Sequence, residues 1–435
     1  MIVYTNKITP RLQYIADFIG QKITGEAFEL TIDNFYFNDY VGPKINYSSS
    51  KINDEELIIN NCPLLFEDSI KEQTISCFEI NGYKAFFKTG GDYPFDIFAA
   101  CFYLLCRYEE YLPHPKDMYG RYTHENSLAF KEGFLNIPLV NIWMEDFKKA
   151  LKEKFPSLNL QSSTFNFQPT YDLDEAFAFK NKGVIKTVGG IVRSVVNGEW
   201  SVVNERISVL REKNQDPYDA YEWMDKLHEK NNLKPIYFFH VAVKKGRYDK
   251  NISPSYPAMQ QLIKQHAEKY SIGIHPSWAS GDDESLLDEE IKILESASAK
   301  KITASRQHYI RFTLPNTFRR LIAAGITDDY SMGYGSINGF RASVTSPFYW
   351  YDLKKEQQTR LLLHPFCFME ANSFFEQKYL PQRAYEEMMY YYSTVNEVNG
   401  VLITIWHNSF LGSHKLFAGW RDVYEEFVEV VRREK

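Results

Sequence analysis

From residue 164 onward, short apolar runs alternate with longer stretches in which apolar residues recur at helical spacing. The strand-like runs are Thr164–Tyr171, Pro235–Val241, Ser271–His275, Ile302–His308, Ile326–Tyr330, Phe340–Ser343, Arg360–Phe366 and Val401–His407. The helical stretches are Val184–Val196, Pro217–Lys230, Tyr256–Lys269, Glu284–Ser298, Pro315–Ala324 and Arg383–Val398. This alternation predicts an α/β fold with a parallel sheet. Seven or eight such units fit a closed or incomplete barrel better than an open sheet.

The first part of the chain lacks this regular alternation and is predicted to form a smaller mixed α/β domain. Its strongest feature is Phe95–Tyr111, which is apolar on nearly all sides as far as Arg107 and therefore predicts a central core helix. We expect Arg107, Glu109 and Glu110 to form the solvated end of that helix. A polar connector marks the boundary, so the predicted domains are residues 1–160 and 161–435.

The composition is that of an ordinary globular protein, and its charge argues against nucleic acid or an anionic membrane as a partner. The net charge is −6, and no basic run favours nucleic acid or an anionic membrane. The chain shows no signal-like start and no apolar stretch long enough to span a bilayer, so we expect a cytoplasmic protein. The five cysteines form no C-x-x-C pair, which suits buried free thiols in a reducing compartment. Aromatic residues make up 16%, which suits sugar-stacking surfaces, although aromatic cores are the more common explanation.

The run Phe165–Asp174 reads as a strand that ends in two carboxylates. Asp172 and Asp174 are two positions apart, so an extended chain directs both side chains to the same side. Two like charges repel each other there, and either a bound cation or a raised pKa would relieve the repulsion. The alternative is that the pair caps a helix that begins near Glu175.

Polar side chains also gather at the carboxyl ends of the later predicted strands, where barrel enzymes place their chemistry. Four of the ten histidines follow this pattern. Any one of them could be a core or capping histidine, but their shared position beside aspartates and arginines predicts one site. The candidates at these ends are His275, Arg306, His308, Asp328, Asp329, Arg341, His364, His407 and Asn408.

The order of these motifs over about residues 164–410 resembles the polysaccharide deacetylase family. The family's first motif, T-F-D-D, is similar to Thr170–Asp174, and the resemblance implies that Asp172 is a general base and Asp174 a metal ligand. His275 is similar to the first metal-binding histidine of the second motif, but Ala279 stands where the second histidine would be. The resemblance implies a distorted (β/α)7-8 barrel, preceded here by the smaller mixed α/β domain.

Three later segments extend the resemblance and bring further roles with it. Arg306 begins a segment similar to R-x-P-[YF], in which His308 replaces the proline and Tyr309 is the aromatic residue. The segment Asp328–Tyr330 is loosely similar to the Asp-rich fourth motif, and Ile405–His407 is similar to the fifth, L-x-H. The resemblance implies that His407 is the general acid, and Arg306 would orient the general base.

The third metal ligand is the open point of this assignment. A catalytic zinc site has three protein ligands, and the resemblance supplies only Asp174 and His275. We expect His308 to be the third, because it follows the next strand along the chain and must cross only about 4.8 Å, one strand spacing. His364 lies further round a barrel and is better placed to contact substrate. The expected substrate-binding residues are Arg341, His364, Trp406 and Tyr309.

The sequence thus favours a metal-dependent hydrolase that removes acetyl groups from an N-acetylated sugar or polysaccharide. The metal would be a divalent ion, with Zn expected and Co or Ni as alternatives, although a metal-free site remains open. One alternative is a carbohydrate-binding pseudoenzyme that lost its metal with Ala279. Another is a glycoside hydrolase that uses Asp172 with Asp328 or Asp329, but that function leaves the strand-end histidines unexplained.

Overall fold

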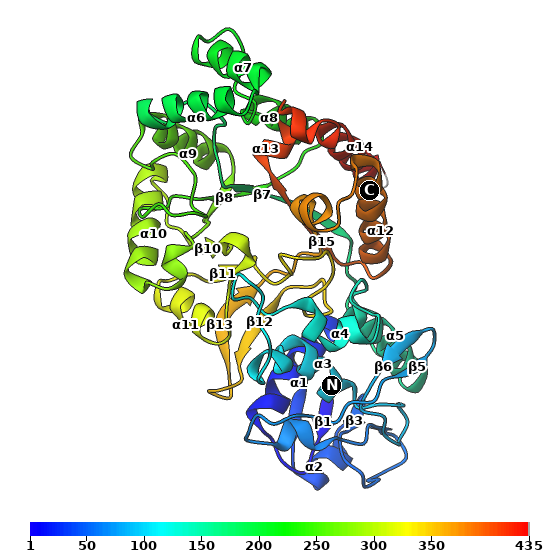
Figure 1. Ribbon diagram of the computed structural model, residues 1–435. Coiled ribbons are helices and arrows are strands. Elements are labelled where there is room, and N and C mark those ends of the chain that lie inside the picture. Colours follow the sequence, from blue (N-terminus) through cyan, green and yellow to red (C-terminus); the bar gives the residue numbers. More distant parts are fainter. Residues whose placement is uncertain (434–435) are drawn as a thin grey trace.

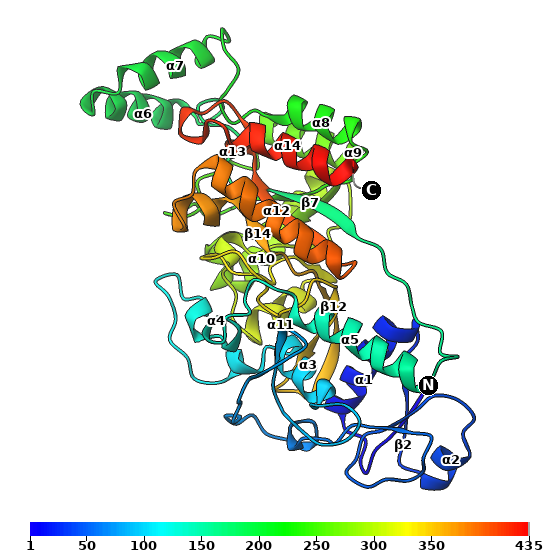
Figure 2. The same ribbon diagram turned by 90° about the vertical axis from the view of Figure 1, so that its right-hand side faces the viewer.

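Two lobes make up the molecule (Figure 1), whose computed structural model describes residues 1–433. The N-terminal lobe, drawn blue to cyan, lies at one end of the molecule, and the larger lobe begins at residue 166. Figure 2 shows the connector between them as an extended chain that leads from α5 into β7. The larger lobe is an α/β structure, as the sequence predicts.

The N-terminal lobe has a small parallel sheet in the order β2-β1-β3-β4, with helices packed beside it. Local sequence explains its first helix: the Thr9 side chain accepts a hydrogen bond from the Leu12 N–H, Pro10 opens the helix, and Gly25 closes it with φ +81°. The elements are β1 Ile2–Tyr4, α1 Pro10–Thr24, β2 Glu29–Thr31, α2 Asn34–Asp39, β3 Lys44–Asn46, β4 Leu57–Ile58, β5 Phe78–Ile80, β6 Tyr83–Ala85, α3 Ile97–Leu105, α4 Leu128–Lys131 and α5 Leu139–Lys154.

The larger lobe alternates strands and helices, which lie outside the strands (Figure 1). Its strands are β7 Asn166–Leu173, β8 Ile236–Phe239, β9 Ser271–Ile274, β10 Ala304–Ser305, β11 Asp328–Asp329, β12 Phe348–Asp352, β13 Gln357–Leu363, β14 Phe368–Met369 and β15 Val401–His407. Its helices are α6 Val184–Val196, α7 Trp200–Leu210, α8 Tyr221–Lys230, α9 Pro257–Lys269, α10 Glu284–Ser298, α11 Asn316–Ala323, α12 Pro381–Glu397, α13 Asn408–Leu411 and α14 Trp420–Arg433.

These nine strands form one sheet in the order β12-β13-β11-β10-β9-β8-β7-β15-β14. Every neighbouring pair is parallel except β12 and β13, which form an antiparallel hairpin at one edge. Within residues 1–433 no ladder joins β14 to β12, so the sheet has two edges and the barrel is incomplete. The order places the carboxyl ends of β15, β7, β8, β9 and β10 next to one another.

Two sequence predictions about secondary structure are wrong. The predicted strand Phe340–Ser343 is a turn, in which the Ser343 N–H donates to the Phe340 carbonyl. The predicted helix Phe95–Tyr111 is too long, since α3 ends at Leu105. Arg107 adopts a left-handed conformation with φ +53°, which breaks the helix.

The sequence predicted a solvated end for this helix, but Arg107 and Glu110, which follow α3, are buried. The Arg107 Nε donates to Glu110 Oε1 at 2.8 Å, and both residues are almost inaccessible to solvent. The same carboxylate accepts two hydrogen bonds from the Arg341 guanidinium, at 2.8 and 2.6 Å. Because Arg341 belongs to the larger lobe, these charges are used to join the two lobes.

The lobes share further contacts and one core. Arg11 of α1 forms an ion pair with Glu356 at 2.6 Å, and the Tyr14 hydroxyl donates to the Tyr349 carbonyl at 2.8 Å. The buried apolar residues of both lobes form a single contiguous cluster. The five cysteines are free thiols. Among the described residues, no helix is both long and apolar enough to cross a membrane.

Candidate active site

The candidate site lies at the carboxyl ends of five adjacent strands. Asp172 pairs in register with His407 of β15 on one side and with Phe238 of β8 on the other. His275 comes directly after β9, and Arg306 and His308 come directly after β10. The carboxyl ends of parallel strands meet at one edge of a sheet, so residues far apart in sequence converge here.

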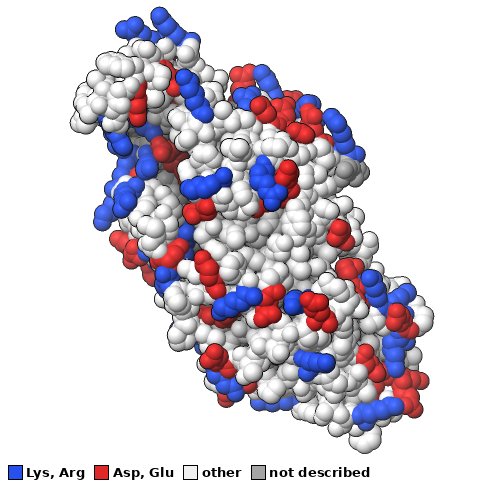
Figure 3. Space-filling view, turned by 45° about the vertical axis from the view of Figure 1, so that its right-hand side comes forward, with Lys and Arg blue, Asp and Glu red and all other residues white. Residues whose placement is uncertain are grey.

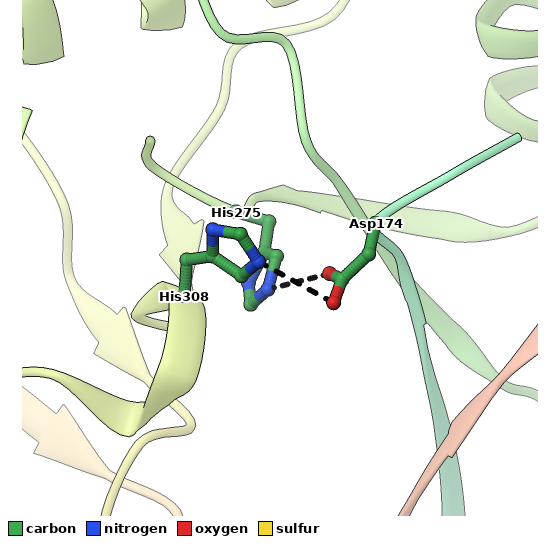
Figure 4. Close-up of side chains that lie close together, drawn as sticks. All are labelled: Asp174, His275 and His308. Atoms are coloured by element: carbon green, nitrogen blue, oxygen red, sulfur yellow. Dashed lines mark ion pairs between the residues drawn. The ribbon is translucent and has the colours of Figure 1, made fainter. Parts of the chain in front are cut away.

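Asp174, His275 and His308 form the centre of the site (Figure 4). The His275 Nε2 lies 3.0 Å from Asp174 Oδ1, and the His308 Nε2 lies 3.3 Å from Asp174 Oδ2. The His407 Nε2 lies 3.5 Å from the same Oδ2. Three imidazole nitrogens therefore face one carboxylate.

The Nδ1 atoms of His275 and His308 face oxygen acceptors, and these contacts bear on which ring nitrogen carries a proton. The His275 Nδ1 lies 2.6 Å from the Arg306 carbonyl oxygen, which can only accept, so Nδ1 carries the proton. Its Nε2 then faces Asp174, whose Oδ1 is buried without a hydrogen-bond partner. His308 resembles it, with Nδ1 3.3 Å from Asp249 Oδ1. An imidazole whose Nδ1 is hydrogen-bonded and whose Nε2 faces a carboxylate has the arrangement of a histidine metal ligand, which binds the cation through a deprotonated Nε2.

The ionisation of the central residues agrees with a strongly polar pocket. Burial acts to raise the pKa of Asp174, but the charges of His308 and His407 outweigh it and hold the pKa well below its ordinary value. Burial likewise acts to lower the pKa of His308, while Asp174 and Asp249 raise it to about 9. The pocket therefore keeps its carboxylate ionised.

Asp172 takes a different partner from Asp174. The Arg306 Nη1 donates to Asp172 Oδ1 at 2.8 Å, and both side chains are buried. The Arg306 Nε donates to the Tyr330 carbonyl at 3.0 Å, so the guanidinium is fixed in place. The second Asp172 oxygen lies 3.9 Å from His275 Nε2 and is turned toward the central group. This is the contact expected of an arginine that orients a general base.

His407 is held by a carboxylate that the sequence analysis missed. Glu370, just after β14, accepts hydrogen bonds from the His407 Nδ1–H and backbone N–H, at 2.6 and 2.7 Å. Burial acts to lower the pKa of His407, but Glu370 and Asp174 outweigh it and raise the pKa well above its ordinary value. Glu370 ends the short apolar run that contains β14, so it has the same strand-end signal as the other candidates.

Asp249 is the second residue that the sequence analysis missed. Its Oδ1 accepts the Trp278 N–H at 2.8 Å and lies 3.3 Å from both His308 Nδ1 and His240 Nε2. His240 is fully buried, so it does not line the rim of the site. Asp249 lies in the long loop between β8 and α9, where no strand end marks it.

Aromatic side chains stand beside His308 at the rim of the site. The Tyr309 ring lies 4.6 Å from the His308 ring and 5.4 Å from the Tyr119 ring, measured between centroids. Trp278 stacks on Tyr248 at 4.2 Å. Tyr119 belongs to the N-terminal lobe, whose neighbouring Arg121 donates from Nη1 to the Tyr309 carbonyl at 2.8 Å. The N-terminal lobe therefore contributes to the rim.

Three of the expected substrate-binding residues have other partners. Trp406 is fully buried against Phe368, Trp420 and Tyr424, so it is a core residue and that expectation is wrong. The expectation that Arg341 binds substrate is also wrong, because its side chain is buried and forms an ion pair with Glu110. His364 stacks on Tyr330 at 4.2 Å and lies 2.8 Å from Asp328, outside the central group.

The comparisons with known proteins give one family match and several similar solved structures. Residues 1–156 match a family described as a family of unknown function (DUF7033). No curated protein matches the sequence. The chain is similar to several solved structures, over a region that covers about three fifths of its length.

A putative polysaccharide deacetylase from Mycobacterium smegmatis is 14% identical, with 62% of this chain and 85% of that chain covered and a TM-score of 0.40. A probable polysaccharide deacetylase from Pseudomonas aeruginosa PAO1 is 10% identical, with the same coverage and a TM-score of 0.41. The PuuE allantoinase is 11% identical, again with 62% and 85% covered and a TM-score of 0.40. These similarities are weak, so we assign chemistry from the geometry of the site.

Proposed function

We propose that the protein is a metal-dependent hydrolase that removes acetyl groups from an N-acetylated sugar or polysaccharide. The observation that carries the proposal is the central group Asp174, His275 and His308, with Asp172 on one side and His407 on the other. Amide hydrolysis requires a base for water, a charge that stabilises the oxyanion, and an acid for the leaving nitrogen. The site offers one candidate for each requirement.

Asp174, His275 and His308 would hold a divalent ion, with Zn expected from the carboxylate and imidazole donors. When bound, such an ion supplies Lewis-acid chemistry at the carbonyl and water. Asp172, held in place by Arg306, would accept the proton of the attacking water. His407, kept protonated by Glu370, would give its proton to the departing amine. His308 thus supplies the donor that Ala279 lacks.

The rim supports a carbohydrate as the acyl carrier. Aromatic faces of Tyr309, Trp278, Tyr248 and Tyr119 stand at one side of the central group. Such faces suit the C–H surface of a sugar ring. The order of the motifs, which resembles that of polysaccharide deacetylases, favours the same substrate class.

Metal analysis tests the proposal most directly. The full chain should bind one Zn, Co or Ni ion and release acetate from an oligomer of N-acetylglucosamine. His308→Ala should weaken metal binding at least tenfold, since even partners of metal ligands contribute about 10–100-fold. His364→Ala is the matched control, a strand-end histidine outside the group, and should keep its metal.

The opposite results would identify the alternatives. Loss of metal only in His364→Ala would show that His308 is not the third ligand. Carbohydrate binding by a chain that takes up no metal and releases no acetate would establish the pseudoenzyme.

A further inference from the structure

The helical hairpin α6–α7 presents an apolar face to solvent. At 100° per residue, six apolar side chains fall on one arc of α6, and Ile185 is 90% and Val196 80% exposed. Trp200, which opens α7, is 61% exposed. This is the reverse of an ordinary surface helix, which buries its apolar face. The exposed arc consists of Val184, Ile185, Val188, Val192, Val195 and Val196.

The packing of the hairpin explains why that arc points outward. The other side of α6 carries small or polar residues, among them Gly190 and the buried Ser194. A side chain at Gly190 would collide with the Arg206 guanidinium of α7, which itself stacks on Phe179 at 4.7 Å. The small side of α6 is therefore the side that α7 covers. Figure 2 shows the hairpin projecting beyond the rest of the larger lobe.

Positive charges border the apolar arc. Residues 180–213 carry seven Lys and Arg side chains against three Glu, in a chain whose net charge is −6. Lys245, from the loop after β8, joins them: burial and the positive charges of Lys186 and Lys182 lower its pKa. In Figure 3 the upper left of the molecule shows a white face with a few Asp and Glu atoms, and Lys and Arg atoms lie above and below it. The cluster forms only in the fold, since no basic run marks it in the sequence.

We propose that the α6–α7 hairpin docks the protein on an anionic phospholipid surface. The valines, Ile185 and Trp200 would enter the boundary between headgroups and acyl chains, and the lysines would contact the headgroups. A second copy of the chain is a poorer occupant, because a two-fold contact would set the basic cluster against itself. The hairpin follows the carboxyl end of β7, so docking would hold the candidate active site beside the bilayer.

Vesicle flotation tests the proposal with the full chain. Wild type should bind vesicles of phosphatidylcholine with phosphatidylglycerol, bind vesicles of phosphatidylcholine alone far more weakly, and dissociate as salt rises. Val188→Asp with Val192→Asp should reduce binding at least tenfold. Lys186→Gln and Lys245→Gln should each reduce it about fivefold. The matched control is Val41→Asp, at a 96% exposed apolar residue of the N-terminal lobe, which should bind as wild type does.

Two outcomes would overturn the proposal. The first is a wild type that fails to float with anionic vesicles at low salt, or a double aspartate variant that floats as wild type does. The second is a concentration-dependent dimer, seen by sedimentation, that the double aspartate variant dissolves while neither protein binds lipid. That result would assign the apolar arc to a second copy.

Discussion

Asp172 and Asp174 are like carboxylates two residues apart, yet the fold gives them different partners. Asp172 is buried against a guanidinium, whereas Asp174 is one-third exposed and faces three imidazoles. A carboxylate that is bound to arginine through one oxygen keeps the other oxygen for proton transfer. A carboxylate that faces several imidazoles suits a metal ligand. These different environments support the proposed roles of Asp172 as the base and Asp174 as the metal ligand.

Substitution of the proposed base, Asp172, should reduce turnover without changing the metal content. Asp172→Asn keeps the size of the side chain and an oxygen for Arg306, but removes the basic oxygen. We expect acetate release to fall about 10²–10⁴-fold, the usual contribution of general base catalysis. Metal content, measured on the purified protein, should remain that of wild type. A loss of metal would show that the roles of Asp172 and Asp174 are exchanged.

The pH profile should report the pairing of His407 with Glu370. The negative charge of Glu370 raises the pKa of His407, so the acid stays protonated to higher pH. Glu370→Gln removes that charge, the pKa of His407 falls, and the alkaline limb of kcat/KM should move to lower pH. Asp328→Asn is the control, because it makes the same change beside His364. An unmoved alkaline limb in Glu370→Gln would exclude His407 as the acid.

Single residues also show how far the sequence could predict the site. The strand-end pattern located Asp172, Asp174, His275, His308 and His407, because parallel strands bring their carboxyl ends together. It could not give the direction of a side chain, so it placed Trp406 at the substrate when that ring faces the core. It missed Asp249 because a loop with no periodic pattern carries it.

At the scale of elements, the sequence located β15 and α10 with their observed bounds but overestimated the short central strands. The run Ile302–His308 contains only the two-residue strand β10, and Ile326–Tyr330 only the two-residue β11. Polar partners explain the early ends. The Ser305 hydroxyl donates to Asp329 at 2.7 Å, and the Ser331 N–H donates to the same carboxylate at 2.9 Å. Propensity cannot show such long-range hydrogen bonds in advance.

The loop that carries Tyr119 should influence substrate binding more than catalysis. Its ring lies at the aromatic rim, where it contacts the rings of Tyr248, Trp278 and Tyr309. Tyr119→Ala should raise KM for an N-acetylglucosamine oligomer about tenfold, the upper range of one aromatic contact, with kcat nearly unchanged. Tyr119→Phe should restore binding. Tyr36→Ala, at an exposed tyrosine on the same lobe, is the control, and an equal effect there would contradict a local role.

At the scale of the whole molecule, the two lobes depend on a buried set of charges. Glu110 lies between Arg107 of its own lobe and Arg341 of the larger lobe, and all three side chains are almost inaccessible. From the sequence we expected Arg107 and Glu110 at a solvated helix end and Arg341 in contact with substrate. Glu110 and Arg341 lie in different lobes, so local sequence patterns could not reveal their ion pair. Truncation of one partner would leave a buried charge without compensation.

Glu110→Gln should therefore destabilise the protein and alter its response to acid. Burial acts to raise the pKa of Glu110, but Arg341 and Arg107 outweigh it and lower the pKa to about 2. A carboxylate with a lowered pKa in the folded state stabilises above its unfolded pKa of about 4.3, and that contribution disappears as the pH falls toward 2. Urea unfolding at neutral pH should show a loss of about 3 kcal/mol in Glu110→Gln, and a weaker further loss in acid than wild type. Glu222→Gln, at an exposed pair with Lys226, should change the free energy of unfolding by less than about 0.5 kcal/mol. If Glu110→Gln unfolds like wild type, Glu110 does not hold the lobes together, and their other contacts and shared apolar core join them.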